Sequence, residues 1–278
     1  MEIDTRIAFS LQWIFLFPLF ISFSLATPAV AQQDSGSASS IIWHDAKNAL
    51  NDGWNIFSSP AHFDSKDWII AGAITGGVFL LFSIDEQARQ LSERNQSSFG
   101  DDIFDLSREY GRAEYGILFS GGMYLGGLGF KDRWTRETGL VVFESILYAG
   151  TFTTIIKTVA GRSRPYLEEG AFHFDGFQTG NDRLSMPSGH STVAFAISSS
   201  LSSRINNTYA TIGLYSLATL TAFSRVYHDQ HWLADTFLGA VIGTAVGTSL
   251  VHRRDHSTGD LDLHVLPSMS GMRVEFRF

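Results

Sequence analysis

The sequence predicts an all-α protein, a bundle of about six core helices embedded in a membrane and followed by a short C-terminal β-hairpin. Apolar segments of roughly 16–20 residues recur along the chain, which is close to the length that crosses a bilayer. These segments are rich in Gly, Ala, Ser and Thr, and such small residues let helices pack closely in membranes. The last residues alternate between apolar and charged side chains, which is the period of a β-strand.

The composition excludes several classes of protein. The chain has 278 residues, enough for one large domain or two small ones. Its 28 acidic and 20 basic residues give a formal charge of -8, which argues against a nucleic-acid partner. The absence of cysteine excludes disulfides, thiolate metal sites and cysteine nucleophiles. The 6 tryptophans and 23 phenylalanines are compatible with aromatic belts at a membrane interface.

Residues 1–31 are predicted to be an export signal peptide. A polar start with Arg6 leads into the apolar stretch "LQWIFLFPLFISFSLA", and Ala29 and Ala31 form an A-x-A cleavage pattern. Cleavage after Ala31 is expected, and an uncleaved anchor helix is the alternative. Residues 32–67 are predicted to be a flexible linker and an amphipathic segment, with one helix and a turn at Ser59–Pro60.

The core domain is predicted to span residues 68–252. Its apolar segments lie at about 68–84, 115–130, 138–156, 190–204, 209–224 and 232–251. Two polar stretches interrupt them, at 85–114 and 157–189. A soluble helical domain is the alternative to a membrane bundle, because the segments are short and the mean hydropathy is only +0.05.

The tail, residues 253–278, differs in kind from the core. Apolar side chains alternate with charged ones from Met272 to the end, and "SMSG" before them is a turn signal. The tail resembles the last strand of bacterial outer-membrane barrels, but one hairpin cannot close a barrel. We therefore expect a hairpin that covers one end of the helical domain.

Three short clusters stand at the ends of the apolar segments. The first is "KTVAGRSRP" at 157–165, the second is "PSGH" at 187–190, and the third is "SRVYHDQHWLAD" at 224–235. The first two are at either end of one loop, and the chain turns back at the third. An alternating bundle therefore brings all three clusters to the same side.

Together the clusters have the chemistry of a phosphate site. Lys157, Arg164 and Arg225 supply positive charges, and guanidinium groups suit phosphate oxygens. Ser188 is a predicted N-cap, and with Gly189 it would offer a hydroxyl and backbone N–H groups at a helix N-terminus. Cations beside a membrane are costly unless an anion compensates them.

Two histidines could act as the nucleophile that attacks phosphorus and as the proton donor. His231 and Asp235 are four residues apart, so on a helix the carboxylate would orient the imidazole and leave its other nitrogen free. His190 could donate a proton to a leaving alkoxide. His228 and His231 also form H-x2-H, but the surrounding arginines disfavour a metal dication. No metal and no cofactor is predicted, and His173 is expected to be a surface loop residue.

The combined pattern K-x6-R-P, P-S-G-H and S-R-x5-H-x3-D resembles the type 2 phosphatidic acid phosphatase family of the phosphatidic acid phosphatase and vanadium haloperoxidase superfamily. The resemblance covers about residues 68–252. It implies that His231 forms a phosphohistidine, that Asp235 orients it, and that His190 acts first as an acid and then as a base. It also implies phosphate-binding roles, which would fall to Lys157, Arg164, Ser188, Gly189 and Arg225.

The resemblance implies a metal-independent phosphatase acting on a phosphomonoester or pyrophosphate, with a lipid phosphate expected as substrate. A soluble periplasmic acid phosphatase of broad specificity, a vanadate-dependent haloperoxidase and a non-catalytic envelope protein are the alternatives. We expect an integral protein of the bacterial envelope with a periplasm-facing site, because the basic loops "KDRWTR" and "HRRDH" should stay inside. With six full crossings, an export signal predicts the opposite orientation.

Overall fold

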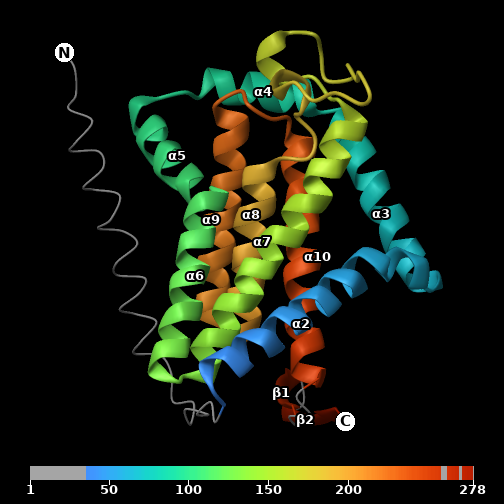
Figure 1. The fold of residues 1–278 in the computed structure, drawn as a ribbon. Helices are drawn as coiled ribbons and strands as arrows, with labels where there is room; N and C mark the ends of the chain where they lie inside the picture. The colour runs from blue at the N-terminus through green and yellow to red at the C-terminus, as the bar shows by residue number, and fades with distance from the viewer. Residues whose placement is uncertain (1–35, 258–261, 269–270, 278) are drawn as a thin grey trace.

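The computed structural model describes residues 36–257, 262–268 and 271–277. The predicted signal peptide, residues 1–31, and the first linker residues lie outside this part of the chain. Helices α6 to α10 lie side by side as a bundle, and α2 crosses the bundle obliquely (Figure 1). The predicted all-α bundle is confirmed.

The helices largely follow the predicted segments. Their bounds are α2 Ala38–Ser58, α3 Ser65–Phe82, α4 Asp85–Arg94, α5 Ser98–Tyr110, α6 Ala113–Phe130, α7 Arg133–Ala160, α8 Gly189–Ile205, α9 Thr208–Tyr227 and α10 Leu233–Ser257. Short 3-10 turns lie at Ser59–His62, Pro165–Leu167 and Asn181–Arg183. The six predicted apolar segments are α3 and α6 to α10, and the predicted helix and turn before them are α2 and the turn at Ser59–His62.

The first polar stretch was expected only to interrupt the apolar helices, but it forms α4 and α5. Acidic residues occupy the first turn of α4, and the Ser97 side chain accepts a hydrogen bond from the Gly100 N–H at the start of α5. Both features stabilise helix N-termini. Helix α4 lies across one end of the bundle, and α5 runs from that end down its side, against α9 (Figure 1).

Helix α8 is the centre of the bundle and packs against α7, α9 and α10. Most of its side chains from Ser191 to Ser202 are buried, although many of them are serine. Close packing explains this composition. A Cβ on Gly243 of α10 would lie 2.3 Å from the Thr192 carbonyl oxygen, so only glycine allows the two helices to approach this closely.

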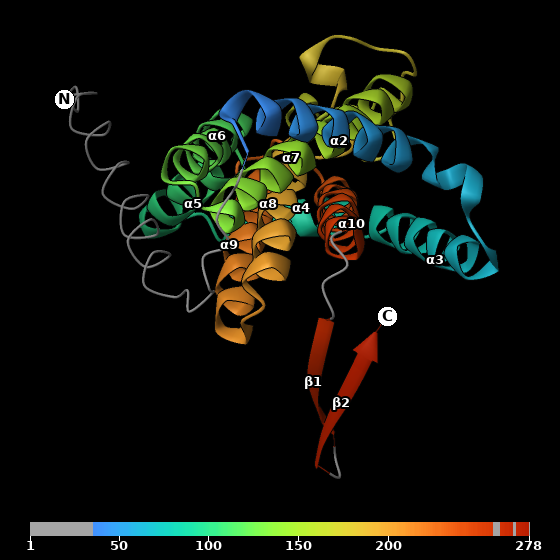
Figure 2. The same ribbon diagram turned by 60° about the horizontal axis from the view of Figure 1, so that its bottom comes forward.

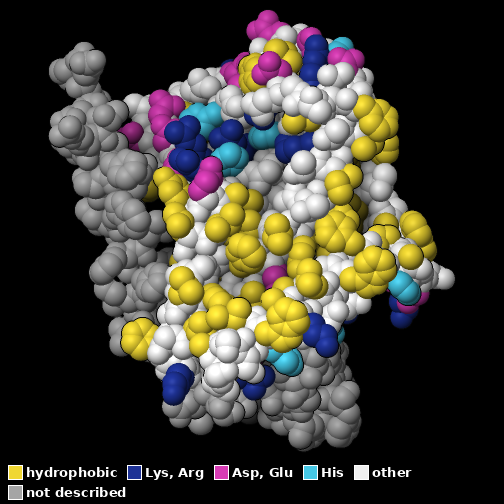
Figure 3. Space-filling model, viewed as in Figure 1, with side chains coloured by type: hydrophobic (Ala, Val, Ile, Leu, Met, Phe, Trp, Pro, Cys, Tyr) yellow, Lys and Arg dark blue, Asp and Glu magenta, His cyan; other side chains and the backbone are white. Residues whose placement is uncertain are grey.

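Three helices in the described part of the chain are long and apolar enough to cross a membrane: Ser65–Phe82, Arg133–Ala160 and Leu233–Arg254. The other three predicted segments, α6, α8 and α9, do not meet both criteria. Helix α3 turns large apolar side chains outward, among them Ile69 and Leu80, which are 70% and 73% exposed. A band of apolar side chains faces outward along the bundle (Figure 3). These features identify an integral membrane protein.

The predicted C-terminal hairpin is present. Strands β1 Asp262–Ser268 and β2 Gly271–Arg277 pair antiparallel, with Val265 opposite Val274. Figure 2 shows the hairpin projecting beyond the end of α10, so the expectation that it covers one end of the bundle is not met.

The bundle has two distinct ends. We call the site end the one where α7 and α9 finish and α8 and α10 begin, with α4, α5 and the loop 161–188 around it (Figure 1). The far end holds the α6–α7 and α8–α9 turns and the last turns of α10. Both predicted basic loops, 131–136 and 252–256, lie at the far end.

Candidate functional site

The N-terminus of α8 is built as the sequence predicts. Ser188 is the N-cap, and its buried Oγ accepts a hydrogen bond from the Ser191 N–H at 3.5 Å. Gly189 and His190 form the first turn. The Ser188 N–H donates to the Asp235 carbonyl oxygen at 2.9 Å, which joins the start of α8 to the start of α10. The free N–H groups of this first turn can bind an anion.

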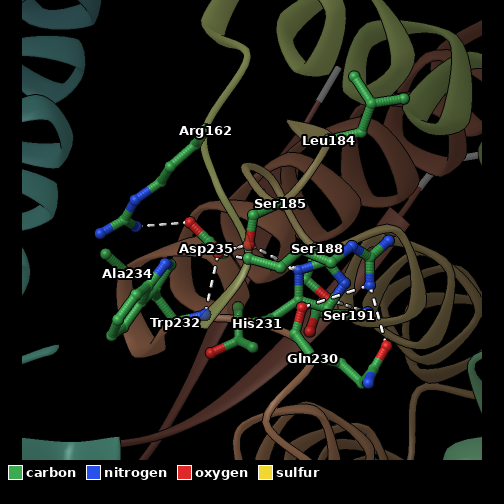
Figure 4. Close-up of polar contacts among 12 residues, drawn as sticks. Arg162, Leu184, Ser185, Ser188, Ser191, Gln230, His231, Trp232, Ala234 and Asp235 are labelled. Carbon is green, nitrogen blue, oxygen red and sulfur yellow. Dashed lines mark hydrogen bonds and ion pairs between the residues drawn. The ribbon is translucent and has the colours of Figure 1, made fainter. Parts of the chain in front are cut away.

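His231 and Asp235 lie beside each other as predicted, but they are not on the same helix. Helix α10 begins at Leu233, so His231 precedes the helix and the pair is not stacked along one helical turn. His231 Nδ1 lies 3.8 Å from Asp235 Oδ2 and 3.5 Å from Ser185 Oγ. The Asp235 carboxylate also accepts the Trp232 N–H at 2.9 Å (Figure 4). This arrangement holds the Nδ1 side of the ring and leaves Nε2 on the opposite side.

A buried arginine that the sequence analysis missed holds the Asp235 carboxylate. Arg162 Nη1 donates to Asp235 Oδ1 at 2.6 Å, and its Nη2 donates to Asp85 Oδ2 at 2.7 Å. All three side chains are fully or almost fully buried. The guanidinium also lies 4.4 Å from the ring centroid of Phe82. The ring centroids of Phe174 and Trp232 lie 5.4 Å from the guanidinium, so two carboxylates and three aromatic rings surround a single buried cation.

The local backbone explains why the side chains of Arg162 and Arg164 contact different groups. Arg162 forms an isolated β-bridge with Phe174, and Arg164 also has an extended backbone. Alternate residues of an extended segment point to opposite sides. Arg162 therefore points toward Asp85 and Asp235, whereas Arg164 bonds the Asn181 carbonyl at 2.9 Å and the Gln230 side chain at 3.1 Å.

Ser185 and Asp85 were also missed. Ser185 Oγ donates to Asp235 Oδ2 at 2.5 Å, and Asp85 Oδ1 accepts the Ala234 N–H at 2.9 Å. Burial raises the pKa of Asp85, and the neighbouring Arg162 partly offsets that effect. The proximity of Asp85 to Asp235 is a tertiary feature with no local sequence signal.

The predicted cations gather at the same end. Lys157 Nζ donates to the Leu184 carbonyl at 2.5 Å and to that of Ser185 at 3.3 Å. Arg225 is buried, and its Nε has no hydrogen-bond partner among the described residues. Burial and the charges of Arg164 and Arg108 lower the pKa of Arg225 to about 10. A buried donor beside other cations is the arrangement expected of an anion site.

His190 faces the same cations. Burial, then the charge of Arg225, then those of Arg112, Arg108 and Lys157 lower the pKa of His190 to about 3. Without a bound anion, the ring is therefore neutral at physiological pH. His231 is also neutral, because burial lowers its pKa well below the ordinary value. A neutral imidazole has the lone pair that a nucleophile needs.

All eight predicted site residues lie at the site end, where side chains of Lys, Arg and His gather above the apolar band (Figure 3). The other two histidines considered have separate partners. His228 Nε2 lies 3.3 Å from Asp105, and His173 Nδ1 lies 2.8 Å from Ser163 Oγ in the half-exposed loop. In the described ranges no group of three or more His, Asp or Glu side chains could hold a metal ion.

Residues 138–258 match the family model of the PAP2 superfamily. The chain is 26% identical over 172 residues to the lipid A 1-phosphatase of Porphyromonas gingivalis, covering 60% of this chain and 34% of that protein. It is 30% identical over 128 residues to a PA-phosphatase related-family protein of Dictyostelium discoideum, covering 40% of this chain and 46% of that protein. The chain thus matches between a third and a half of the length of these relatives.

Two solved structures are similar over most of their length. The crystal structure of Aquifex aeolicus LpxE gives a TM-score of 0.48 at 22% identity, covering 61% of this chain and 95% of that one. The Bacillus subtilis transmembrane PAP2 type phosphatidylglycerolphosphate phosphatase gives 0.47 at 18% identity, covering 66% and 95%.

Proposed function

Residues 138–258 match the family model of the PAP2 superfamily, and from this match we propose that the chain is a metal-independent lipid phosphatase that works through a phosphohistidine. The observation that carries the proposal is the buried Nε of Arg225, which lacks a partner among the described residues. The charge of Arg225 acts on His190, and its carbonyl accepts the His231 N–H at 3.2 Å. A phosphoryl oxygen would satisfy the Arg225 Nε donor. Lys157 and Arg164 would offset the remaining charge.

In the first step, His231 Nε2 attacks the phosphorus and forms an N–P bond. The bond from phosphorus to the leaving oxygen breaks, and His190 gives that oxygen a proton. Asp235 stabilises the charge on the phosphorylated imidazole through the Nδ1 side, where the two groups are 3.8 Å apart. His190 must therefore be protonated when substrate is bound, and a bound phosphate dianion raises its pKa in the required direction.

In the second step, water attacks the phosphorus of the phosphohistidine and gives its proton to His190. The N–P bond breaks, so His231 is regenerated and inorganic phosphate is released. Lys157, Arg164, Arg225, Ser188 and Gly189 would hold the three equatorial oxygens in both steps.

The position of the site supports a lipid-linked substrate. The membrane-spanning helix α3 ends at Phe82, and Phe82 lies against Arg162. Asp85, three residues later, binds the same guanidinium. The site therefore begins where the apolar span stops, which is the level of lipid headgroups. The names of the relatives, a lipid A 1-phosphatase and a PA-phosphatase related protein, agree with this substrate class.

A phosphate-release panel tests the proposal. Purified protein in lipid vesicles is given phosphatidate, phosphatidylglycerol phosphate, undecaprenyl pyrophosphate, lipid A and the soluble p-nitrophenyl phosphate. We expect release from at least one lipid, unaffected by EDTA, abolished by His231→Ala and retained by the matched variant His228→Ala. Acid-labile labelling of the wild-type chain by a substrate carrying ³²P would report the phosphohistidine. A fully active His231→Ala chain would contradict the mechanism.

We also propose that residues 68–252 form the catalytic domain, in a bacterial envelope membrane, with the site facing the periplasm. The orientation rests on the basic loops at the far end, since such loops stay in the cytoplasm. A cleaved export signal would instead put α2, and with it the far end, outside. Because the chain has no cysteine, single cysteines at Ser97, Asp182 and Lys131 give a direct test. A membrane-impermeant thiol reagent should label the first two from outside the cell and spare the third.

A further inference from the structure

Helix α2 has three stripes of different chemistry along its length. Trp43, Leu50 and Trp54 are 75%, 77% and 76% exposed. At 3.6 residues per turn these three positions lie within about 40° of each other around the helix. A single helix face thus presents two indole rings and a leucine outward, which is unusual for a surface in contact with water.

A second stripe fixes α2 to the bundle. Asp45 accepts hydrogen bonds from Arg136 of α7 and, at 2.9 Å, from Tyr124 of α6. Asp52 pairs with Arg254 of α10 at 3.4 Å. The docked face is therefore held by ion pairs, so the orientation of the apolar stripe is determined.

Tyr148 of α7 contacts the middle of α2 and adds to its attachment to the bundle. Its hydroxyl donates to the Ala49 carbonyl at 2.6 Å, and its ring lies so near Gly53 that a Cβ there would be 3.0 Å away. Arg136 and Arg254 stand at the far end of their helices, away from Lys157 and Asp235. Helix α2 therefore starts at the far end and crosses the bundle obliquely toward its middle, where Phe57 stacks on Phe152 of α7 (Figure 1).

The third stripe is polar. His44, Asn48, Asn51 and Asn55 lie within about 60° of each other, roughly 110° from the centre of the apolar stripe. The His44 and Asn48 side chains are hydrogen-bonded at 3.0 Å. A helix with one apolar stripe, one polar stripe and one docked stripe fits a boundary between hydrocarbon and water.

We propose that α2 lies in the bilayer interface at the far end, with Trp43, Leu50 and Trp54 among the acyl chains and the polar stripe in water. The occupant of the apolar stripe is lipid, because this surface continues into the outward face of α3, where Trp68 and Ile69 are 61% and 70% exposed. Tryptophan also prefers the interface, since its ring is apolar and its N–H is polar.

This placement sets the depth of the catalytic site. Helix α3 follows α2 after the 3-10 turn Ser59–His62 and has 18 residues, a length of about 27 Å, close to the hydrocarbon thickness. With α2 held at one interface, Phe82 and the adjoining site reach the other. This depth does not depend on whether the chain hydrolyses any particular substrate.

Spin labels on the cysteine-free chain test the placement. Leu50→Cys and Trp54→Cys carry a nitroxide on the apolar stripe, and the matched neighbours Asn51→Cys and Asn55→Cys carry it on the polar stripe. Leu80→Cys on α3 is the lipid reference, and Thr179→Cys in the loop is the water reference. Power-saturation EPR in phosphatidylethanolamine and phosphatidylglycerol vesicles then measures collisions with oxygen and with the water-soluble Ni-EDDA.

We expect labels at 50 and 54 to collide with oxygen as the Leu80 label does, and labels at 51 and 55 to favour Ni-EDDA. If positions 50 and 54 favour Ni-EDDA, α2 lies in water and the proposal is wrong. If they are shielded from both reagents, a second copy or another protein covers the stripe, which also overturns it. The readout needs no catalysis, so an inactive protein would refute the proposed function and leave this result standing.

Discussion

Arg162 Nη1 donates to Asp235 Oδ1 across 2.6 Å, and neither side chain is exposed. Asp235 in turn lies beside the imidazole of His231. The geometry of the proposed nucleophile thus depends on a cation two residues before Arg164, which no part of the catalytic pattern includes. The same guanidinium bonds Asp85, the first residue of α4, and lies over Phe82, the last residue of α3, so it links the site to the membrane-spanning helix.

Replacing Arg162 should therefore disable both the fold and the site. Arg162→Met leaves the Asp85 and Asp235 carboxylates buried without their common cation, which costs about 3–5 kcal/mol in the free energy of unfolding. Thermal unfolding in detergent and phosphate release measure the two effects. Adding Asp85→Asn should recover part of the stability. Arg183→Met is the control, because its half-exposed pair with Glu169 is worth less than about 1 kcal/mol. Equal stability of Arg162→Met and the wild type would refute this role.

Ser185→Ala should slow the reaction and leave the chain folded. The hydroxyl donates to Asp235 Oδ2 at 2.5 Å, and a hydrogen bond to a charged group contributes about 1.5–3 kcal/mol. We expect kcat to fall by roughly 10- to 100-fold. Ser191→Ala is the matched control on α8: the Ser191 Oγ is buried and lacks a partner among the described residues, so its removal should be nearly neutral. Similar rates for the two variants would contradict the proposal that the Ser185 hydroxyl supports catalysis through Asp235.

Binding of a phosphate analogue should take up a proton at His190. Burial and the neighbouring cations lower the pKa of His190 to about 3, and a bound anion raises it. Between the free and bound pKa values, affinity should fall by up to tenfold for each unit of rising pH. Calorimetry of vanadate or phosphate binding in buffers of different ionisation enthalpy counts this proton. His190→Asn should remove the uptake that remains after correcting for the ligand's own titration, and an unchanged count would exclude His190.

Arg225→Met should separate stability from activity. The Arg225 Nε is buried and has no hydrogen-bond partner in the described part of the chain, so the guanidinium costs free energy on folding. We expect an equal or higher unfolding temperature together with a loss of at least about 100-fold in kcat/KM. Phosphate release and differential scanning measure the two quantities. A lower unfolding temperature with modest loss of rate would instead make Arg225 a structural residue.

The sequence predicts the apolar helices better than it predicts the polar helices around the site. Six apolar segments predicted α3 and α6 to α10, because long runs of apolar and small residues have few alternatives to a buried helix. Helices α4 and α5 were missed because they are polar, and only their caps and contacts at the site end distinguish them from a loop. Three of the six predicted segments have the length and hydropathy of a membrane span, and α8 is less apolar because its side chains pack against α7, α9 and α10.

The sequence by itself determined the residue types of the site, because the spacing of Lys157, Arg164, Ser188, Arg225, His231 and Asp235 around helix ends is a local property of the chain. Only the tertiary structure decided what holds them. Arg162 meets Asp85 and Asp235 from segments far apart along the chain, and α2 turns its tryptophans outward because Asp45 and Asp52 are paired on the bundle. A buried charge takes whichever partner the fold brings within hydrogen-bond distance, and that partner is set by packing.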